Sequence, residues 1–166
     1  MLTLVRRFLV LAGLMFWLGG FTFYSGVVVP VGQSVLLSHT EQGFITREVT
    51  NYLNLSGAVA LILFAWDTAR SPDPCRWRRR LRWLTWIAMF LILGILVWLH
   101  GCLDALLNVD LHQLTDRKAF RSLHRWYLWL STIQWACGVG FTGLTLLEWR
   151  AEDSARLKGN MEETGA

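Results

Sequence analysis

The sequence predicts an all-α integral membrane protein, a four-helix bundle with both termini in the cytoplasm. Three observations predict this class: the share of apolar residues, four long apolar stretches, and the distribution of Lys and Arg between them. Hydrophobic residues make up 54% of the 166 residues, which is typical of a polytopic membrane protein. A helical span needs roughly 20 mostly apolar residues to cross a hydrocarbon core of about 30 Å. The stretches that approach or meet this length are 8–29, 49–69, 84–103 and 126–147.

These stretches divide the chain into two parts. We expect residues 1–150 to form one four-span transmembrane domain and residues 151–166 to form a polar, frayed cytoplasmic tail. The apolar part of the first stretch is longer than the 7–15 residues usual in a signal peptide, and no Ala-x-Ala site follows it. We therefore interpret it as an uncleaved span. Pro30 should kink or end this helix.

The later elements follow from turn residues and apolar runs. Asn51, Asn54 and Ser56 interrupt the start of the second stretch, so it is the weakest of the four spans. The segment 71–74, Ser-Pro-Asp-Pro, predicts the turn that ends this span. The loop 104–124 mixes apolar and charged residues, which predicts a short interfacial helix. A capped helix start near Thr115 or Asp116 should then lead into the fourth span.

The orientation follows from the positive charges. If the four spans alternate in direction, eleven of the 16 Lys and Arg residues lie on the side of the two termini and five on the other. Positive residues are retained on the cytoplasmic side, which places both termini inside. We expect the protein to reside in a membrane that bounds the cytoplasm.

The link before the third span carries the densest positive charge. A basic cluster beside a span usually lies against anionic lipid headgroups, where each charge contributes about 1 kcal/mol. The link is too short for the folded basic face that nucleic-acid binding requires, so we expect a lipid partner and no nucleic acid. The predicted headgroup contacts are Arg76, Arg78, Arg79, Arg80 and Arg82.

Polar residues follow one face of several spans. On the fourth span, polar side chains recur at intervals of three and four, and a polar face also descends the second span from the outer side. Polar side chains are costly against lipid, so these faces should point inward. They predict an outward-opening ligand pocket, and interhelical hydrogen bonding is the alternative. The predicted pocket residues are Tyr24, Asn54, His100, Tyr127, Ser131 and Gln134.

A second candidate site lies at the outer ends of the third and fourth spans. His100 and Asp104 lie one turn apart on one helical face, and His124 precedes the fourth span at a similar depth. Two imidazoles oriented by a carboxylate are a ligand set for a divalent or cuprous ion, and two histidines can hold a haem. Hydrogen bonding of interfacial histidines to water or headgroups is the alternative.

The first span also carries a family resemblance. Its sequence, Phe16-Trp-Leu-Gly-Gly-Phe-Thr-Phe-Tyr-Ser-Gly-Val-Val-Val-Pro30, has a Trp-x-Gly-Gly-x-x-Phe pattern followed by a proline. This pattern resembles the opening of small bacterial four-helix membrane proteins of unknown function and of copper-resistance D-like membrane domains. In the latter a histidine often precedes the tryptophan, whereas residues 13–16 here are Gly-Leu-Met-Phe. The resemblance implies a small helical protein of the bacterial inner membrane and assigns no copper ligand in this helix.

These observations favour a non-enzymatic protein that binds a small ligand, a partner membrane subunit or a second copy of itself through the outward polar pocket. The sequence contains no phosphate-binding Gly-rich loop, no His-Glu-x-x-His motif and no Ser nucleophile elbow. Metal or haem handling through His100 and His124 is the first alternative. An enzyme that acts on lipid or quinone is the second.

Overall fold

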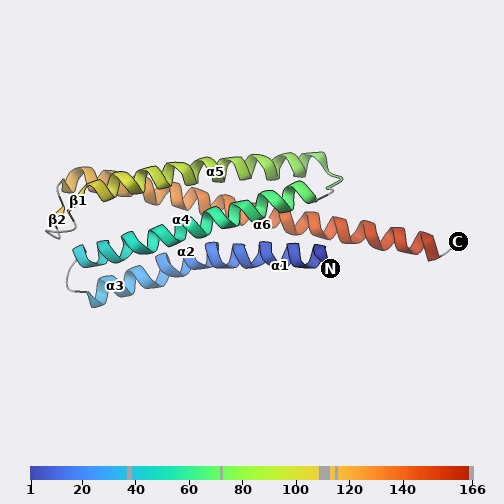
Figure 1. Cartoon of the computed structure of the whole chain (residues 1–166), viewed down its shortest axis with the longest axis horizontal. Coiled ribbons are helices and arrows are strands. Elements are labelled where there is room, and N and C mark those ends of the chain that lie inside the picture. The colour runs from blue at the N-terminus through green and yellow to red at the C-terminus, as the bar shows by residue number, and fades with distance from the viewer. Residues whose placement is uncertain (37–38, 72, 109–112, 115, 165–166) are drawn as a thin grey trace.

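The computed structural model describes residues 1–166 except 37–38, 72, 109–112, 115 and 165–166. For residues 39–40, 107–108, 113–114, 160 and 162–164 it describes the backbone and not the side chain. The described residues form four long helices, all long and apolar enough to span a membrane, which confirms the predicted all-helical class (Figure 1). The first runs through α1 (Leu2–Leu14), η1 (Met15–Gly19), α2 (Gly20–Phe23), η2 (Tyr24–Val28) and α3 (Val29–Val35). The other three are α4 (His39–Arg70), α5 (Arg76–Ala105) and α6 (Arg117–Thr164).

Pro30 is predicted to kink or end the first helix, and the helix does not end there. It continues to Val35, and two π-helical turns, η1 and η2, interrupt its α-helical pattern. The second of these turns lies directly before Pro30. A proline has no N–H for the carbonyl four residues earlier, and its ring crowds that carbonyl. A wider π-helical turn accommodates both effects without breaking the helix.

Neighbouring helices run antiparallel. The first helix packs on α4, α4 packs on α5, and α5 has its most extensive contact with α6. Both termini therefore lie toward the same end of the bundle, which we call the terminal end and which also holds the 71–75 link (Figure 1). The opposite end, which holds the two short strands, is called the hairpin end.

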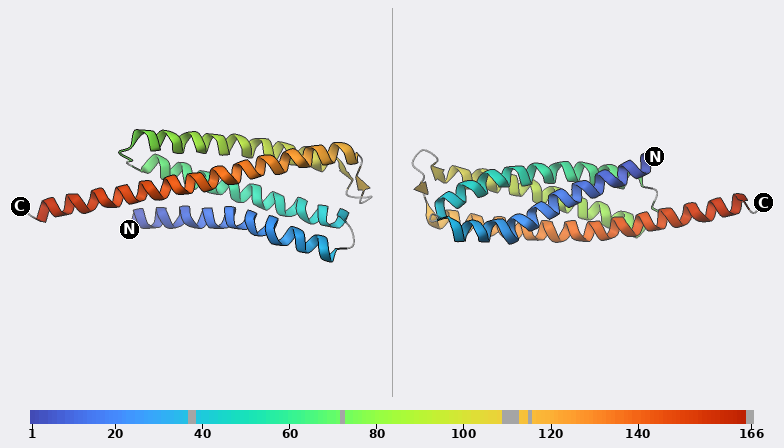
Figure 2. Two further views of the ribbon diagram at one scale, coloured as in Figure 1. Left: turned by 180° about the vertical axis from the view of Figure 1, so that it is seen from behind. Right: turned by 90° about the horizontal axis from the view of Figure 1, so that it is seen from below.

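Helix α6 is much longer than a membrane span. Its 48 residues correspond to about 72 Å at 1.5 Å per residue, and Figure 2 shows its last turns projecting beyond the other helices. The segment after residue 150, predicted as a frayed polar tail, continues α6 as a helix to Thr164. Residues 148, 149 and 152 belong to the packed part of this helix and are buried, which explains why it does not end with its apolar stretch.

In the described part of the connection between α5 and α6, two short strands stand where an interfacial helix is predicted, and residues 109–112 of that prediction lie outside the described residues. Strand β1 (Leu107–Asn108) pairs antiparallel with β2 (Gln113–Leu114), so the reversing chain pairs its backbone groups across the loop. The predicted cap at Asp116 is confirmed. Its Oδ1 accepts hydrogen bonds from the backbone N–H groups of Lys118 (2.8 Å) and Ala119 (3.0 Å). Thr115 lies outside the described residues.

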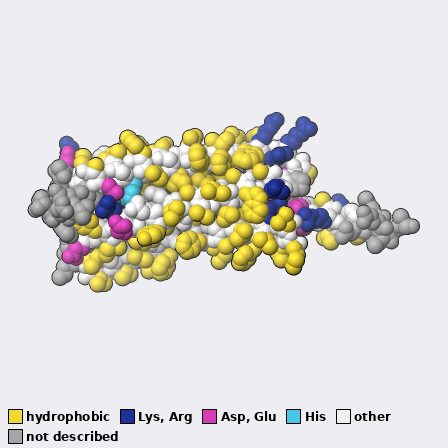
Figure 3. All heavy atoms as spheres, viewed as in Figure 1, with side chains coloured by type: hydrophobic (Ala, Val, Ile, Leu, Met, Phe, Trp, Pro, Cys, Tyr) yellow, Lys and Arg dark blue, Asp and Glu magenta, His cyan; other side chains and the backbone are white. Residues whose placement is uncertain are grey.

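The core is a narrow apolar column between the four helices. Phe64 and Phe141 stack with ring centroids 4.9 Å apart, and Trp17 lies 6.2 Å from Phe64. The helices also present many large hydrophobic side chains outward, which Figure 3 shows covering the middle of one face with charged groups toward both ends. An apolar exterior between two polar ends fits a bundle that packs in lipid. The buried core residues are Val10, Leu14, Trp17, Ala60, Leu61, Phe64, Met89, Leu93, Phe141 and Trp149.

Candidate functional site

Several of the polar residues predicted to line the outward pocket form hydrogen bonds between helices. Tyr127 Oη donates to Asn54 Oδ1 (3.2 Å), which joins α6 to α4. Gln134 is buried, and its Nε2 donates to the backbone carbonyl of Met89 on α5 (3.1 Å). Ser131, one turn beyond Tyr127, is buried as well. These contacts favour the interhelical alternative for these residues.

Tyr24 does not join that group. Its Oη donates to Thr46 Oγ1 at 3.0 Å, so it links the first helix to α4. The Thr46 hydroxyl in turn donates to the Gln42 carbonyl one turn earlier (2.8 Å). The polar residues predicted to line one pocket thus make separate helix-to-helix bonds.

The three predicted metal ligands contact other side chains: Asp104 pairs with Arg47 and His100, and His124 packs on Phe120. Asp104 Oδ1 accepts a hydrogen bond from Arg47 Nε (2.9 Å), and its other oxygen lies 3.6 Å from His100 Nε2. His124 stacks on Phe120 with ring centroids 6.0 Å apart. Among the described residues, no group of three or more His, Cys, Asp or Glu side chains could hold a metal ion. A cation beside Asp104 would compete with the Arg47 guanidinium.

The five arginines predicted to contact headgroups fall into three groups. Arg76, Arg79 and Arg80 are exposed, as headgroup contacts would require. Arg78 pairs with Asp73 through two bonds, Nε to Oδ2 (2.7 Å) and Nη2 to Oδ1 (2.6 Å). Arg82 is the exception to the predicted set, because only 1% of its side chain is exposed. It lies between helices and is not available to a lipid headgroup.

Arg82 is the centre of a buried ionic cluster at the terminal end. Its Nη2 donates to Asp67 Oδ2 on α4 (2.6 Å), and its Nη1 lies 3.4 Å from Glu148 Oε2 on α6. The side chains of Asp67 and Glu148 are 0% and 1% exposed. The Ser71 hydroxyl donates to the other oxygen of Glu148. One guanidinium thus bridges carboxylates from two helices, which its planar fork of donors allows.

The first helix joins this cluster through its two arginines. Arg6 Nε lies 3.0 Å from Asp67 Oδ1, and its Nη2 donates to Glu152 Oε2 (3.2 Å). Arg7 donates to Glu152 Oε2 and to Asp153 Oδ2, both at 2.9 Å. All four helices therefore contribute charged groups to one network. Each buried charge in it lies beside a charge of opposite sign, which offsets the cost of removing it from water.

Aromatic rings border the cluster. The Trp149 indole donates to Asp67 Oδ1 at 3.4 Å and is buried. The Arg82 guanidinium lies over the Phe141 ring at 5.5 Å, and that of Arg7 lies over Trp149 at 5.3 Å. Both distances are within the range of cation–π attraction. These rings separate the charges from the apolar core.

Sequence reasoning missed this cluster because each member stands within a few residues of the end of an apolar stretch. Arg6, Asp67, Arg82 and Glu148 all occupy such positions, where charged residues usually face water or headgroups. A signal was nevertheless present. Alternating spans bring all four positions to the same end, and two are acidic and two basic.

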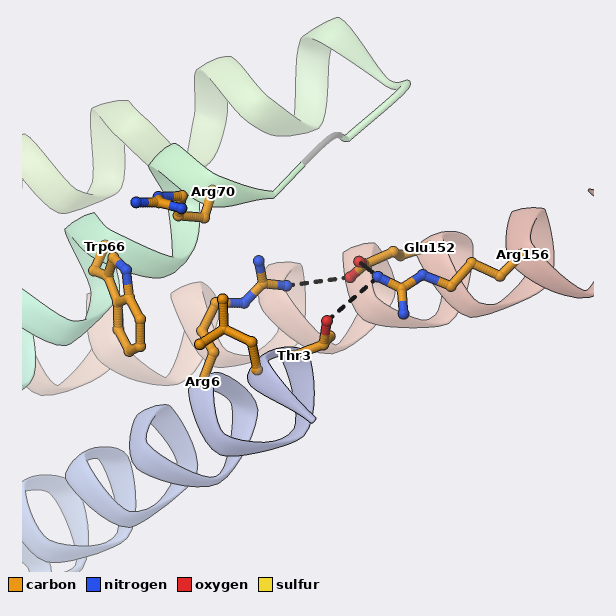
Figure 4. Close-up of a pocket in the computed structure, with 7 residues that line it drawn as sticks. Thr3, Arg6, Trp66, Arg70, Glu152 and Arg156 are labelled. Atoms are coloured by element: carbon orange, nitrogen blue, oxygen red, sulfur yellow. Dashed lines mark hydrogen bonds and ion pairs between the residues drawn. The ribbon is translucent and has the colours of Figure 1, made fainter.

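An open cavity of about 370 Å³ adjoins the cluster between α1, the end of α4 and α6 (Figure 4). Arg156 Nη2 donates to Glu152 Oε1 (2.6 Å) and to Thr3 Oγ1 (3.4 Å) across its floor. Arg70 on the α4 wall is exposed and has no ion pair or hydrogen bond with the described residues. The lining residues are Leu2, Thr3, Arg6, Trp66, Arg70, Glu152 and Arg156.

The lining has three guanidinium groups and one carboxylate, and therefore a formal charge of +2. Two of the three, Arg6 and Arg156, already pair with Glu152. Arg70 supplies the unpaired charge, and the exposed part of Arg156 supplies further donors. A guanidinium group can bind carboxylate or phosphate oxygens through paired hydrogen bonds. The cavity is therefore chemically suited to an anion.

The adjacent link is fixed by Asp73. Burial by itself raises the pKa of Asp73, but the hydrogen bonds from Arg78 and from the Cys75 backbone N–H outweigh that effect, so the pKa of Asp73 is lowered. The ionised carboxylate therefore holds Asp73 against the start of α5.

Comparison of this chain with models of protein families, with characterised proteins and with solved structures finds no match. The resemblance of the first helix to copper-resistance D-like domains stays a prediction.

Proposed function

We propose that this chain is a non-enzymatic, multi-pass protein of the bacterial inner membrane that binds an anionic ligand at its terminal end, with that end in the cytoplasm. The observation that carries the proposal is the cavity lined by Arg6, Arg70 and Arg156 against a single carboxylate. Eleven of the 16 Lys and Arg residues lie toward this end, which supports its cytoplasmic orientation.

The buried cluster supports the same proposal by making the site rigid. Arg6 is held from one side by Asp67 and from the other by Glu152, so its position on the cavity wall does not depend on a ligand. A site whose charges are already oriented loses less entropy on binding. The outward pocket, by contrast, has its polar groups engaged in bonds between helices.

The test is anion-dependent stabilisation of the purified protein in a non-ionic detergent. Pyrophosphate, a soluble probe, should raise the melting temperature, because a ligand that binds only the folded state stabilises it. Arg70→Gln combined with Arg156→Gln should abolish that rise. The matched control is Arg79→Gln with Arg80→Gln, which removes the same charge from exposed positions outside the cavity at the same end.

The melting temperatures without pyrophosphate show whether either double variant is damaged, since Arg156 also pairs with Glu152. Equal pyrophosphate responses of the two double variants would contradict the proposal, as would a wild-type protein that no anion stabilises. Metal or haem handling, a partner subunit or second copy, and a lipid- or quinone-active enzyme stay predictions.

A further inference from the structure

The cavity at the terminal end combines an apolar wall with a cationic one. Leu2 is 71% exposed and lines it from α1, and the Trp66 ring lines it from α4. Arg70 follows Trp66 by one helical turn, so the ring and the free guanidinium lie on one face of α4 (Figure 4). A ligand that fills this cavity contacts apolar side chains and a positively charged group that lie within one helical turn of each other.

The position of the cavity along the bundle adds a second constraint. Helix α1 exposes large apolar side chains next to the cavity, at Leu4, Val5 and Phe8. At the terminal end, the last turns of α6 extend beyond the other helices (Figure 1). The cavity therefore lies where the apolar surface of the bundle meets its charged end, which is the level of the headgroups in a membrane-spanning protein.

We infer that the anionic ligand is a phospholipid with a net negative headgroup, whose phosphate binds Arg70 and whose glycerol and upper acyl chain lie on Trp66 and Leu2. This inference rests on the proposed anion site and names its ligand. A free phosphate would use the same guanidinium group but would leave the apolar wall without a partner. Basic pockets between helices at the cytoplasmic level are a known setting for such headgroups.

Arg70 is the decisive residue because its loss should not disturb the fold. It is exposed and has no partner among the described residues, whereas Arg6 and Arg156 both support the ionic cluster. Removing one interfacial charge that contributes about 1 kcal/mol corresponds to about a fivefold weaker affinity for the lipid. The same change at Arg79 removes an equal charge from outside the cavity.

The experiment measures lipid binding to the full chain in detergent by native mass spectrometry, with phosphatidylglycerol and phosphatidylcholine of identical acyl chains. We expect phosphatidylglycerol to bind more tightly, Arg70→Gln to weaken it about fivefold, and Arg79→Gln to leave it unchanged. Equal binding of the two lipids would overturn the inference. Equal effects of the two variants would overturn it as well, because the headgroup would then sense only the general charge of this end.

A soluble arm separates the two sources of phosphate. Dihexanoyl phosphatidylglycerol below its micellar concentration is compared with glycerol 3-phosphate, which lacks acyl chains. Tighter binding of the diacyl compound, reduced by Trp66→Ala, supports the lipid. Equal affinities would refute the lipid while leaving the proposed anion site intact, and binding of neither compound would refute both.

Discussion

Replacement of Arg82 by Met should strongly destabilise the bundle, because Arg82 pairs with buried carboxylates on two other helices. The side chain is 1% exposed, and methionine fills much of its volume without supplying a donor. Glu148 would keep only the Ser71 hydroxyl, and Asp67 would lose its shortest ion pair, 2.6 Å, while keeping Arg6. Removing one partner of a buried pair costs about 3–5 kcal/mol, because the other charge stays buried without compensation.

The assay is equilibrium unfolding in mixed micelles, which yields the free energy of unfolding for wild type and variants. Arg79→Met is the matched control, since Arg79 is exposed on the same helix, and it should lie within about 0.5 kcal/mol of wild type. Adding Glu148→Gln to Arg82→Met should recover part of the loss, because the stranded carboxylate is then neutral. Equal stabilities of Arg82→Met and Arg79→Met would refute the assignment of a buried, mutually dependent cluster.

Three further predictions test other parts of the structure. Gln134→Leu should lower the free energy of unfolding by only about 0.6 kcal/mol, the usual contribution of one hydrogen bond between membrane helices; a loss of several kcal/mol would show a larger role. Gly57→Ala should cost about 1–3 kcal/mol in the same assay, because its Cβ would lie 2.8 Å from the Trp17 indole nitrogen; an unchanged stability would refute that close packing. The pKa of Asp73 is lowered from 3.8, so its pair with Arg78 stabilises the fold above that pH and is lost as the pH falls through the lowered value. Asp73→Asn should therefore show a shallower loss of stability than wild type on acidification below about pH 4, and parallel curves would contradict the pairing.

The fold class was predictable because a span is a property of composition and length. Long apolar runs need no knowledge of their neighbours, and the four helices follow the four runs. Local chemistry was predictable in the same way, as the cap at Asp116 shows. Pro30 was harder, because whether a proline ends a helix depends on whether the preceding turn can widen.

The site was less predictable because it depends on partners far apart in the chain. Arg82 has the same local sequence environment as the exposed arginines around it, and only its position facing Asp67 and Glu148 distinguishes it. The polar stripe on α6 was recognised as inward-facing, and Gln134 is indeed buried. The stripe alone could not show that the Gln134 amide donates a hydrogen bond to a backbone carbonyl on α5. Every residue has a backbone carbonyl, so the sequence does not indicate which one accepts.

The pairing of Arg6 and Arg7 with the last helix has a consequence for biogenesis. Both arginines lie in the first helix, and their α6 partners, Glu152 and Asp153, lie 145 or more positions later in the chain. During synthesis the first helix can meet Asp67 once α4 has been made, but its remaining positive charge stays uncompensated until α6 has been made. The final docking of the first helix is therefore a late event in assembly.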